Sequence, residues 1–260
     1  MLTRTVLSLT LLAVAGTAAA AEDGSWDYWV RVQASVGSIG LGGEASFSDA
    51  NIPGTTFDMA DVGLDTSEIT PAFELGLTTP VLSFHGYLGY QAWSTEGSAT
   101  LIAPISFGGR IFSGALDSSA TVSDLYAEFC WGPIELDVAG FSIGVAVHEL
   151  GLQTELSSVG QTVELDESAT IPTLAVRAYV APLDMLEAEV MVHALSVPVG
   201  DASGSYLSAS GQVAWYPISY VGLIAGYRYT MIDVEVESGD TKAMANVSLS
   251  GPFLGLAAQF

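Results

Sequence analysis

Apolar and polar residues alternate with a period of two along most of the chain after about residue 26. The run GFSIGVAVHE, for example, sets Phe141, Ile143, Val145 and Val147 against smaller or polar neighbours. This alternation is typical of β-strands whose two faces meet different surroundings, and no run with a helical period competes with it. The sequence therefore predicts an all-β protein.

Ten segments carry the alternation. They cover residues 26–37, 68–78, 82–99, 111–130, 138–155, 169–181, 185–197, 204–216, 219–236 and 242–260. In the segment 111–130, Leu116 and Val122 fall on one parity while Leu125 and Phe129 fall on the other, which predicts a β-bulge there. Eight or twelve strands would result if one hairpin were assigned wrongly.

The connections between these segments alternate in length. Four are short and contain proline, as tight turns do, and they read TTPV, WGPIEL, APLD and YPIS. The others are longer and polar, above all residues 38–67. Short turns on one side and long loops on the other are typical of barrels that span an outer membrane. With both termini on the short-turn side, the number of strands must be even.

Aromatic residues gather at the predicted short-turn edge. They are Trp26, Tyr28, Trp131, Phe141, Trp215, Tyr216, Tyr220 and Phe260. Such a ring is expected where a barrel crosses a membrane interface. A soluble β-sandwich, which is the alternative fold, has no need of aromatic residues at one height.

Charged residues occupy one parity of the strands, and the opposite parity is nearly free of charge. An Arg or Lys that faces lipid near the membrane centre costs about 2–4 kcal/mol, whereas a charge that faces the lumen can pair. We therefore expect the apolar parity to face lipid and the charged parity to point inward. The inward set is Arg31, Glu74, His85, Asp124, Glu128, Arg177, Glu187, Glu189, His193 and Arg228.

We expect the three inward arginines to pair with the inward acids, since buried charges persist only when they are paired and hydrogen-bonded. Ten strands enclose a space that side chains can largely fill. Two interpretations of this network remain open at this point. It is either structural filling of the barrel or the lining of a narrow polar conduit.

The start of the chain predicts export. Arg4 precedes an apolar run from about Val6 to Ala15, and Ala19-Ala20-Ala21 fits the pattern before a cleavage site. We expect residues 1–21 to be a secretory signal and residues 22–260 to form one domain. The whole chain is 50% hydrophobic and only 13% charged, which is unusual for a secreted soluble domain.

The last strand ends in GPFLGLAAQF, with apolar or aromatic residues at every second position. Leu254, Leu256, Ala258 and Phe260 resemble the C-terminal assembly signal of bacterial outer-membrane β-barrel proteins. The resemblance implies a closed antiparallel up-and-down transmembrane barrel in the outer membrane of a Gram-negative bacterium. It also implies outer-membrane lipids and the barrel-assembly machinery as partners. It names no specific function, because such barrels include pores, adhesins, structural proteins and enzymes.

The charge of the chain excludes one class of partner. There are 29 acidic residues against six Lys and Arg, and nucleic acid binding requires neutralising cations. The acids include two predicted loop clusters, Asp58, Asp61 and Asp65, and Glu164, Asp166 and Glu167. Carboxylates suit hard cations such as Ca²⁺, but these spacings do not match an EF-hand loop. Divalent cations at these loops are one interpretation and solvated surface acids are the other.

The sequence contains neither of the catalytic motifs that we considered. The candidates His85, His148 and His193 lack the Asp-x-His spacing of an omptin-like protease site, and no G-x-S-x-G motif is present. Without a phosphate-binding glycine loop, a zinc spacing or a nucleotide fingerprint, we expect no cofactor and no metal of those classes. The single cysteine, Cys130, excludes an intrachain disulfide and is expected to be a small buried residue. A structural or surface-interaction role, a narrow channel and a rim-site enzyme remain as candidate functions.

Overall fold

The computed structural model describes residues 29–48, 54–64, 67–79, 83–136, 138–199, 202–238 and 241–260. These residues form a closed antiparallel barrel of ten strands, which confirms the predicted fold class and strand number. The predicted signal at 1–21, Trp26, Tyr28 and Asp65 lie outside the described residues. None of the helical structure in the described ranges is long and apolar enough to cross a membrane.

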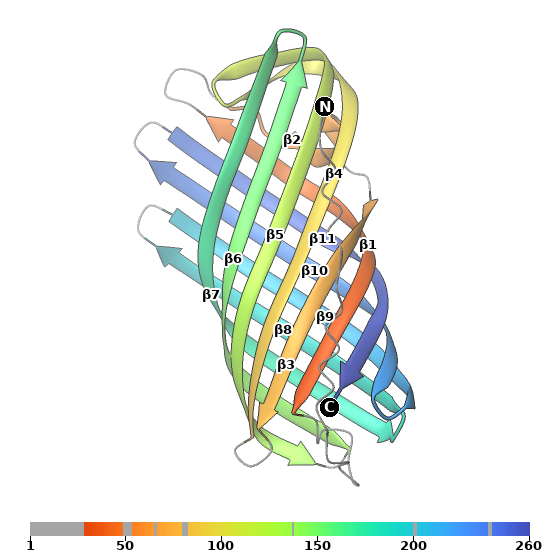
Figure 1. The fold of residues 1–260 in the computed structure, drawn as a ribbon. Coiled ribbons are helices and arrows are strands. Elements are labelled where there is room, and N and C mark those ends of the chain that lie inside the picture. Colours follow the sequence, from red (N-terminus) through yellow and green to blue (C-terminus); the bar gives the residue numbers. More distant parts are fainter. Residues whose placement is uncertain are drawn as a thin grey trace.

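Each strand of the barrel pairs with its neighbour in sequence, and the last strand closes onto the first (Figure 1). The barrel strands are β1 (Val30–Ser48), β3 (Ser67–Thr79), β4 (Phe84–Phe107), β5 (Arg110–Leu136), β6 (Ala139–Ser158), β7 (Gln161–Leu183), β8 (Leu186–Val199), β9 (Ala202–Ile218), β10 (Val221–Ser238) and β11 (Thr241–Gln259). A two-residue strand, β2 (Phe57–Asp58), and a 3₁₀ turn, η1 (Met59–Val62), lie between β1 and β3.

Closure brings the first and last strands together along their length. β1 pairs with β11 from Arg31 opposite Gln259 to Ser48 opposite Lys242. At the end of this seam, the Phe260 amide donates to the Val30 carbonyl at 2.9 Å. We call this end of the barrel the terminal end and the opposite end the mouth. A closed seam satisfies the backbone groups that an open sheet edge would expose to hydrocarbon.

The two faces of the wall differ as the sequence predicts. On β6, Val145 is 55% exposed on the outer face, whereas its neighbour Ala146 is 1% exposed on the inner face. The same contrast recurs on β11, where Leu256 faces outward and Ala257 is buried. The outer face therefore presents an apolar belt, as expected of a wall that meets hydrocarbon.

Aromatic side chains mark the terminal end of this belt. Trp131, Phe141, Trp215, Tyr220 and Phe260 are all exposed there. Tyr216 lies at this end as predicted, but it is buried and does not belong to the exposed ring. Successive strand residues face opposite sides, so an outward Trp215 turns Tyr216 toward the interior.

The strands of one half of the barrel extend further toward the mouth than the others (Figure 1). β5 has 27 residues, whereas β8 has 14. The prediction of long loops at the mouth was wrong for β4–β5 and β6–β7, which join through Gly108-Gly109 and Val159-Gly160. Residues 38–48 likewise extend β1, and Glu164, Asp166 and Glu167 lie on β7. Beyond the belt both faces of a strand can be polar, so the alternation fades although the strand continues.

In the described part of the chain, β7 is one of the strands whose edge is unpaired toward the mouth, as β4 is beyond Gln91. β7 pairs with β8 from Leu183 up to Leu174, which lies opposite Ala194. Nearer the mouth, from Thr173 to Gln161, the described residues give β7 a ladder with β6 and none with β8. Pro172 lies on β7 next to the point where the two strands separate, and a proline suits an edge because it has no N–H to donate.

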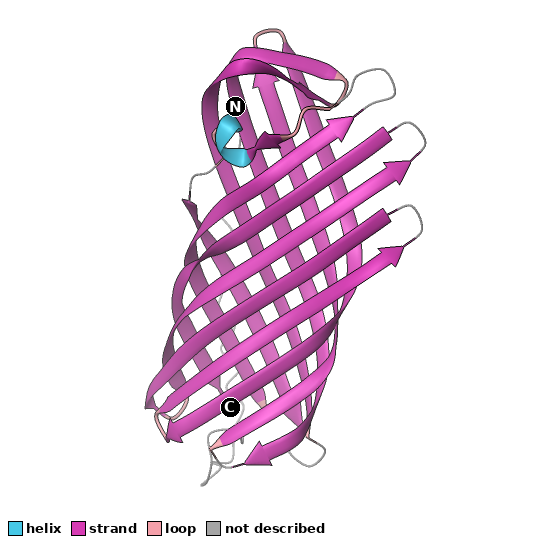
Figure 2. Cartoon of the chain, turned by 180° about the vertical axis from the view of Figure 1, so that it is seen from behind, coloured by secondary structure: helices cyan, strands magenta, loops and turns pink. Residues whose placement is uncertain are grey.

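The mouth is filled by a segment that we call the plug, residues 54–64, which contains β2 and η1 (Figure 2). Its apolar side chains Phe57, Met59, Val62 and Leu64 are buried. They form one core with inward residues of the wall, including Ile39, Leu41, Trp93, Ile105, Phe107, Phe112, Leu116, Ala120, Val122, Leu156, Val247 and Leu249. The interior next to the mouth is therefore apolar and packed.

The β4–β5 hairpin bends across the mouth and covers the plug (Figure 1). The Ser106 amide donates to Thr55 Oγ1 at 3.1 Å, and the rings of Phe57 and Phe107 meet edge to face with centroids 5.9 Å apart. Gly97 on β4 also lies close to Gly63 in the plug. A Cβ added to Gly97 would lie 1.8 Å from the Gly63 carbonyl oxygen. These three contacts hold the plug inside the barrel.

The plug core explains the apparent phase change between Val122 and Leu125, for which a β-bulge was predicted. Leu116 and Val122 face inward together with Asp124 and Glu128, so the parity never changes. The inner surface changes instead, from charged near mid-strand to apolar near the mouth. The register of β5 shifts nearer its two ends. Against β4 it shifts near the mouth, where Gly114 and Phe112 lie opposite Leu101 and Ile105, and against β6 it shifts between Trp131 and Ile134.

An arginine placed on the apolar belt should destabilise the barrel in lipid. We expect Val145→Arg to lower the free energy of unfolding by about 2–4 kcal/mol, because the charge meets hydrocarbon. Gln153→Arg, on the same outer face of β6 but nearer the mouth, should cost about 0–1 kcal/mol. Urea titration in phospholipid vesicles measures both changes, and equal costs would contradict the assigned belt.

Candidate functional site

One guanidinium, that of Arg177 on β7, organises the charged interior. Its Nε lies 2.9 Å from Glu128 Oε1, and its Nη2 lies 2.7 Å from Glu128 Oε2 and 2.8 Å from Glu74 Oε2. Its Nη1 donates to Glu189 Oε1 at 2.8 Å. The Tyr87 ring lies 3.6 Å from the guanidinium carbon. Arg177 therefore neutralises carboxylates from three strands and stacks on an aromatic ring.

A second ion pair joins this cluster to β1. Arg31 Nη1 lies 2.7 Å from Glu187 Oε1 and 3.5 Å from Glu189 Oε2. Gln212 also donates to Glu189 Oε2 at 2.9 Å. Glu189 is thus shared by both arginines, and the ion pairs form one connected network across the lumen.

Local sequence makes room for these long side chains. Cys130, Ala146 and Ala175 are small, are buried and form a cluster on the inner wall. Small inward residues next to inward charges leave space for Arg177 and Glu128 to reach across the lumen. The Cys130 thiol donates to Glu128 Oε1 at 2.9 Å, so it lies buried at the base of the network.

A second group of polar residues surrounds Asp124. Its Oδ1 lies 2.9 Å from His148 Nδ1, and its Oδ2 accepts from Gln91 at 3.0 Å and from the Tyr206 hydroxyl at 3.0 Å. His193 Nε2 lies 3.0 Å from Glu128 Oε2, which links this group to Arg177. The rings of His148 and His193 are 4.9 Å apart.

The structure brings most of the predicted inward residues together. Arg31, Glu74, Glu128, Arg177, Glu187, Glu189 and His193 share the network, and Asp124 joins it through histidine and tyrosine. Four members were missed: His148, Tyr206 and Gln91 around Asp124, and Tyr126, whose hydroxyl donates to Glu74 Oε2. Each lies on the inward parity of its strand, so a search for polar as well as charged residues on that parity would have found them.

Two of the predicted inward residues lie outside the ion-pair network. His85 lies apart from the network, near the terminal end, where it pairs with Glu135 at 2.8 Å and contacts Thr78. Arg228 was expected to pair with an acid, but within the described residues no carboxylate forms an ion pair with it. Its guanidinium carbon lies 4.8 Å from the centre of the Phe253 ring instead. The Arg228 guanidinium therefore contacts an aromatic ring where a carboxylate was expected.

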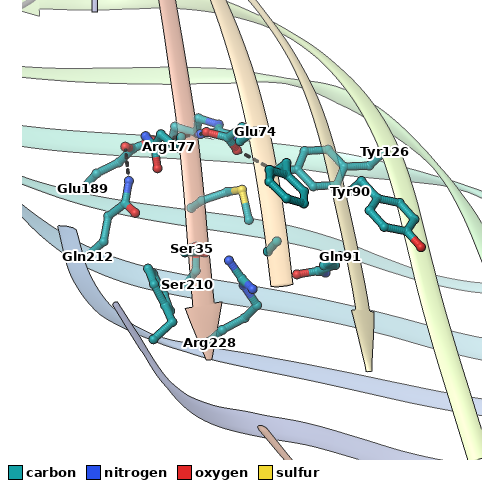
Figure 3. A pocket seen from close by; sticks show the side chains of 15 residues that line it. Ser35, Glu74, Tyr90, Gln91, Tyr126, Arg177, Glu189, Ser210, Gln212 and Arg228 are labelled. Atoms are coloured by element: carbon teal, nitrogen blue, oxygen red, sulfur yellow. Dashed lines mark hydrogen bonds and ion pairs between the residues drawn. The ribbon is translucent and has the colours of Figure 1, made fainter. Parts of the chain in front are cut away.

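The space left inside the barrel is small. A polar cavity of about 40 Å³ lies beside Arg177 and Arg228, with Glu74, Gln91 and Gln212 in its wall (Figure 3). A water molecule needs on the order of 10–15 Å³, so this cavity holds a few waters.

The predicted acidic clusters differ from a metal cage. Asp58 Oδ1 accepts from the Ala60 amide and Asp61 Oδ2 accepts from the Asp58 amide, so both acids cap η1. Glu164, Asp166 and Glu167 are exposed along β7. In the described part of the chain, no three His, Cys, Asp or Glu side chains gather closely enough to hold a metal by themselves.

Removing the central arginine should destabilise the barrel strongly. We expect Arg177→Met to lower the free energy of unfolding by about 3–5 kcal/mol, because Glu74, Glu128 and Glu189 would keep their buried charges without their main partner. Arg110→Met changes an exposed arginine and should stay within about 0.5 kcal/mol of the parent. Urea unfolding followed by tryptophan fluorescence measures both, and a cost below 1 kcal/mol for Arg177→Met would contradict the central role.

Comparison with known proteins supports the fold. No protein-family model and no curated protein matches the chain. Among solved structures, the outer-membrane protease OmpT from Escherichia coli is similar with a TM-score of 0.58 at 8% identity, over 89% of this chain and 96% of that one. The translocator domain of the autotransporter NalP from Neisseria meningitidis gives a TM-score of 0.46 at 11% identity, over 89% of each chain. At these identities the likeness concerns architecture alone, and the chain has the fold of outer-membrane β-barrel proteins.

Proposed function

We propose that this protein is a non-conducting barrel of the bacterial outer membrane with a structural or surface-interaction role. The observation that carries the proposal is the filled lumen. The plug and the β4–β5 hairpin occupy the mouth, and the network around Arg177 crosses the interior. The cavity of about 40 Å³ is too small for solutes larger than water.

The outer face beyond the belt supports a role at the surface. Glu96, Ser119, Glu155 and Glu164 lie side by side on β4 to β7, in direct cross-strand register. Like charges directly opposite each other, as in Glu155 and Glu164, destabilise a sheet. A cationic partner, including the divalent cations that bridge lipid phosphates, would relieve this repulsion. We infer that this acidic sheet is the part of the protein that meets other surface components.

The apolar belt and the aromatic residues at its terminal end support a location in a membrane. A predicted signal at 1–21 and the resemblance of the last strand to an assembly signal favour the outer membrane of a Gram-negative bacterium. Outer-membrane lipids and the barrel-assembly machinery are the partners that follow from this location.

The two other candidate functions have less support. A narrow channel would need a route through the plug core, where Val62 and Leu116 are almost completely buried. An enzyme would need a carboxylate and a histidine that substrate can reach. Asp124 and His148 form a carboxylate–histidine pair, but substrate could not reach it because both side chains are almost completely buried.

Electrical recording separates a filled barrel from a channel. We expect the purified protein to insert into planar bilayers without steady single-channel conductance. Replacing residues 54–64 by a short Gly-Ser linker should also leave the bilayer silent, because the Arg177 network still crosses the lumen. Steady channels that change with Glu74→Gln or Arg228→Gln would contradict the proposal and favour a conduit.

The last residue allows a test of assembly in cells. We expect Phe260→Ala to reduce the amount of assembled barrel in the outer membrane several-fold while refolding into detergent stays normal. The substitution keeps the backbone amide that donates to Val30, so the seam itself is preserved. Gln259→Ala is the matched control and should assemble like the parent. Equal assembly of the two variants, or failure of Phe260→Ala to refold in detergent, would contradict a recognition role.

A further inference from the structure

Three buried polar atoms in one part of the inner wall make no hydrogen bond to any described residue. They are His148 Nε2, His193 Nδ1 and Thr173 Oγ1. The side chains of His148 and His193 are 1% and 0% exposed. An unsatisfied buried polar group costs about 1–3 kcal/mol, so three of them together point to a bound species.

The three residues lie on adjacent strands. Thr173 on β7 is paired with Ala146 on β6, two residues from His148 on the same face. His193 on β8 is paired with Ala175, two residues from Thr173 on the same face. The two imidazole rings lie 4.9 Å apart at an angle of 69°. When two imidazoles share a tetrahedral ion at about 2.0–2.1 Å per nitrogen, their ring centres are on the order of 5 Å apart.

The other nitrogen of each ring already has a carboxylate. His148 Nδ1 lies 2.9 Å from Asp124, and His193 Nε2 lies 3.0 Å from Glu128. Metal-binding histidines almost always donate their second N–H to a carboxylate, a carbonyl or water. The carboxylate fixes the tautomer that leaves the remaining nitrogen as an acceptor. Here both rings leave that nitrogen buried on the side away from their carboxylate.

The charge of the interior agrees with a cation. Arg31, Arg177 and Arg228 are the inward arginines, and Glu74, Asp124, Glu128, Glu187 and Glu189 are the inward carboxylates. With three positive and five negative side chains, this set of residues has a net charge of −2. One divalent ion between two neutral imidazoles supplies the balance, and it would lie next to Asp124 and Glu128.

We propose that His148 Nε2 and His193 Nδ1 bind a divalent transition-metal ion of the zinc class inside the barrel wall, with Thr173 Oγ1 beside it. Imidazole nitrogen suits Zn²⁺, Ni²⁺ and Cu²⁺ better than Ca²⁺ or Mg²⁺. Because two protein nitrogens leave the coordination incomplete, water or the Thr173 hydroxyl fills the other positions. The site connects β6 to β8 across β7 and is distinct from the acidic outer sheet.

Cobalt binding tests the proposal on the whole refolded chain. The protein is refolded in detergent with chelator, dialysed and titrated with Co²⁺ at fixed pH, and visible absorption and calorimetry report the stoichiometry. We expect one Co²⁺ per chain, displaced by Zn²⁺. His148→Gln and His193→Gln should each weaken binding at least tenfold. Asp124→Asn, which removes the carboxylate behind His148, should weaken it about 10–100-fold.

His85→Gln is the matched control, since His85 also faces a carboxylate but lies outside this group. It should bind Co²⁺ like the parent. A second measurement needs no variant: crystals of the parent soaked in Zn²⁺ should give an anomalous peak between the rings of His148 and His193. Absence of that peak, a water in its place, or equal loss of Co²⁺ binding in His85→Gln would overturn the proposal. Two protonated imidazoles that bind no metal would overturn it equally.

Discussion

Charges inside this barrel must find their partners inside it, because the outer side of the wall is apolar and offers none. Arg177 meets this constraint for carboxylates from three strands. Glu189 also contacts Arg31, and Glu128 also contacts His193, so these two residues extend the network. Breaking such a network by removing one member leaves a buried charge, whereas replacing all of it by apolar residues need not destabilise the barrel. The strands are therefore held in register by interactions that cross the lumen as well as by their ladders.

Period-two alternation was sufficient to predict the barrel because lipid imposes one rule on the outer face. Val145 and Leu256 illustrate it, since each is apolar and exposed between inward neighbours. The rule weakens outside the membrane, where both faces of a strand meet polar surroundings. That is why residues 161–168 were assigned to a loop although they continue β7. Strand ends toward the mouth were predictable only as far as the belt extends.

The charged interior was partly predictable for a similar reason. Arginine and glutamate on the inward parity of a closed barrel have few alternatives to pairing with each other. Which residues pair depends on distances across the lumen, and these follow from strand number and stagger. Arg228 shows the limit, because it contacts the Phe253 ring and forms no ion pair with an acid in the described part of the chain. The plug was not predictable, since Phe57 and Val62 lie in a segment without alternation and their burial depends on where the mouth lies.

The separation of β7 from β8 has a consequence for association between molecules. From Gln161 to Thr173, β7 forms no ladder with β8 among the described residues, so the side of its backbone that faces away from β6 resembles an edge strand. Such an edge is a template for intermolecular β-pairing, and charged side chains along it are a common protection. Glu164, Asp166 and Glu167 give this stretch three negative charges, so two copies meeting edge to edge would repel each other. The same acids would favour pairing with a strand that carries lysine or arginine.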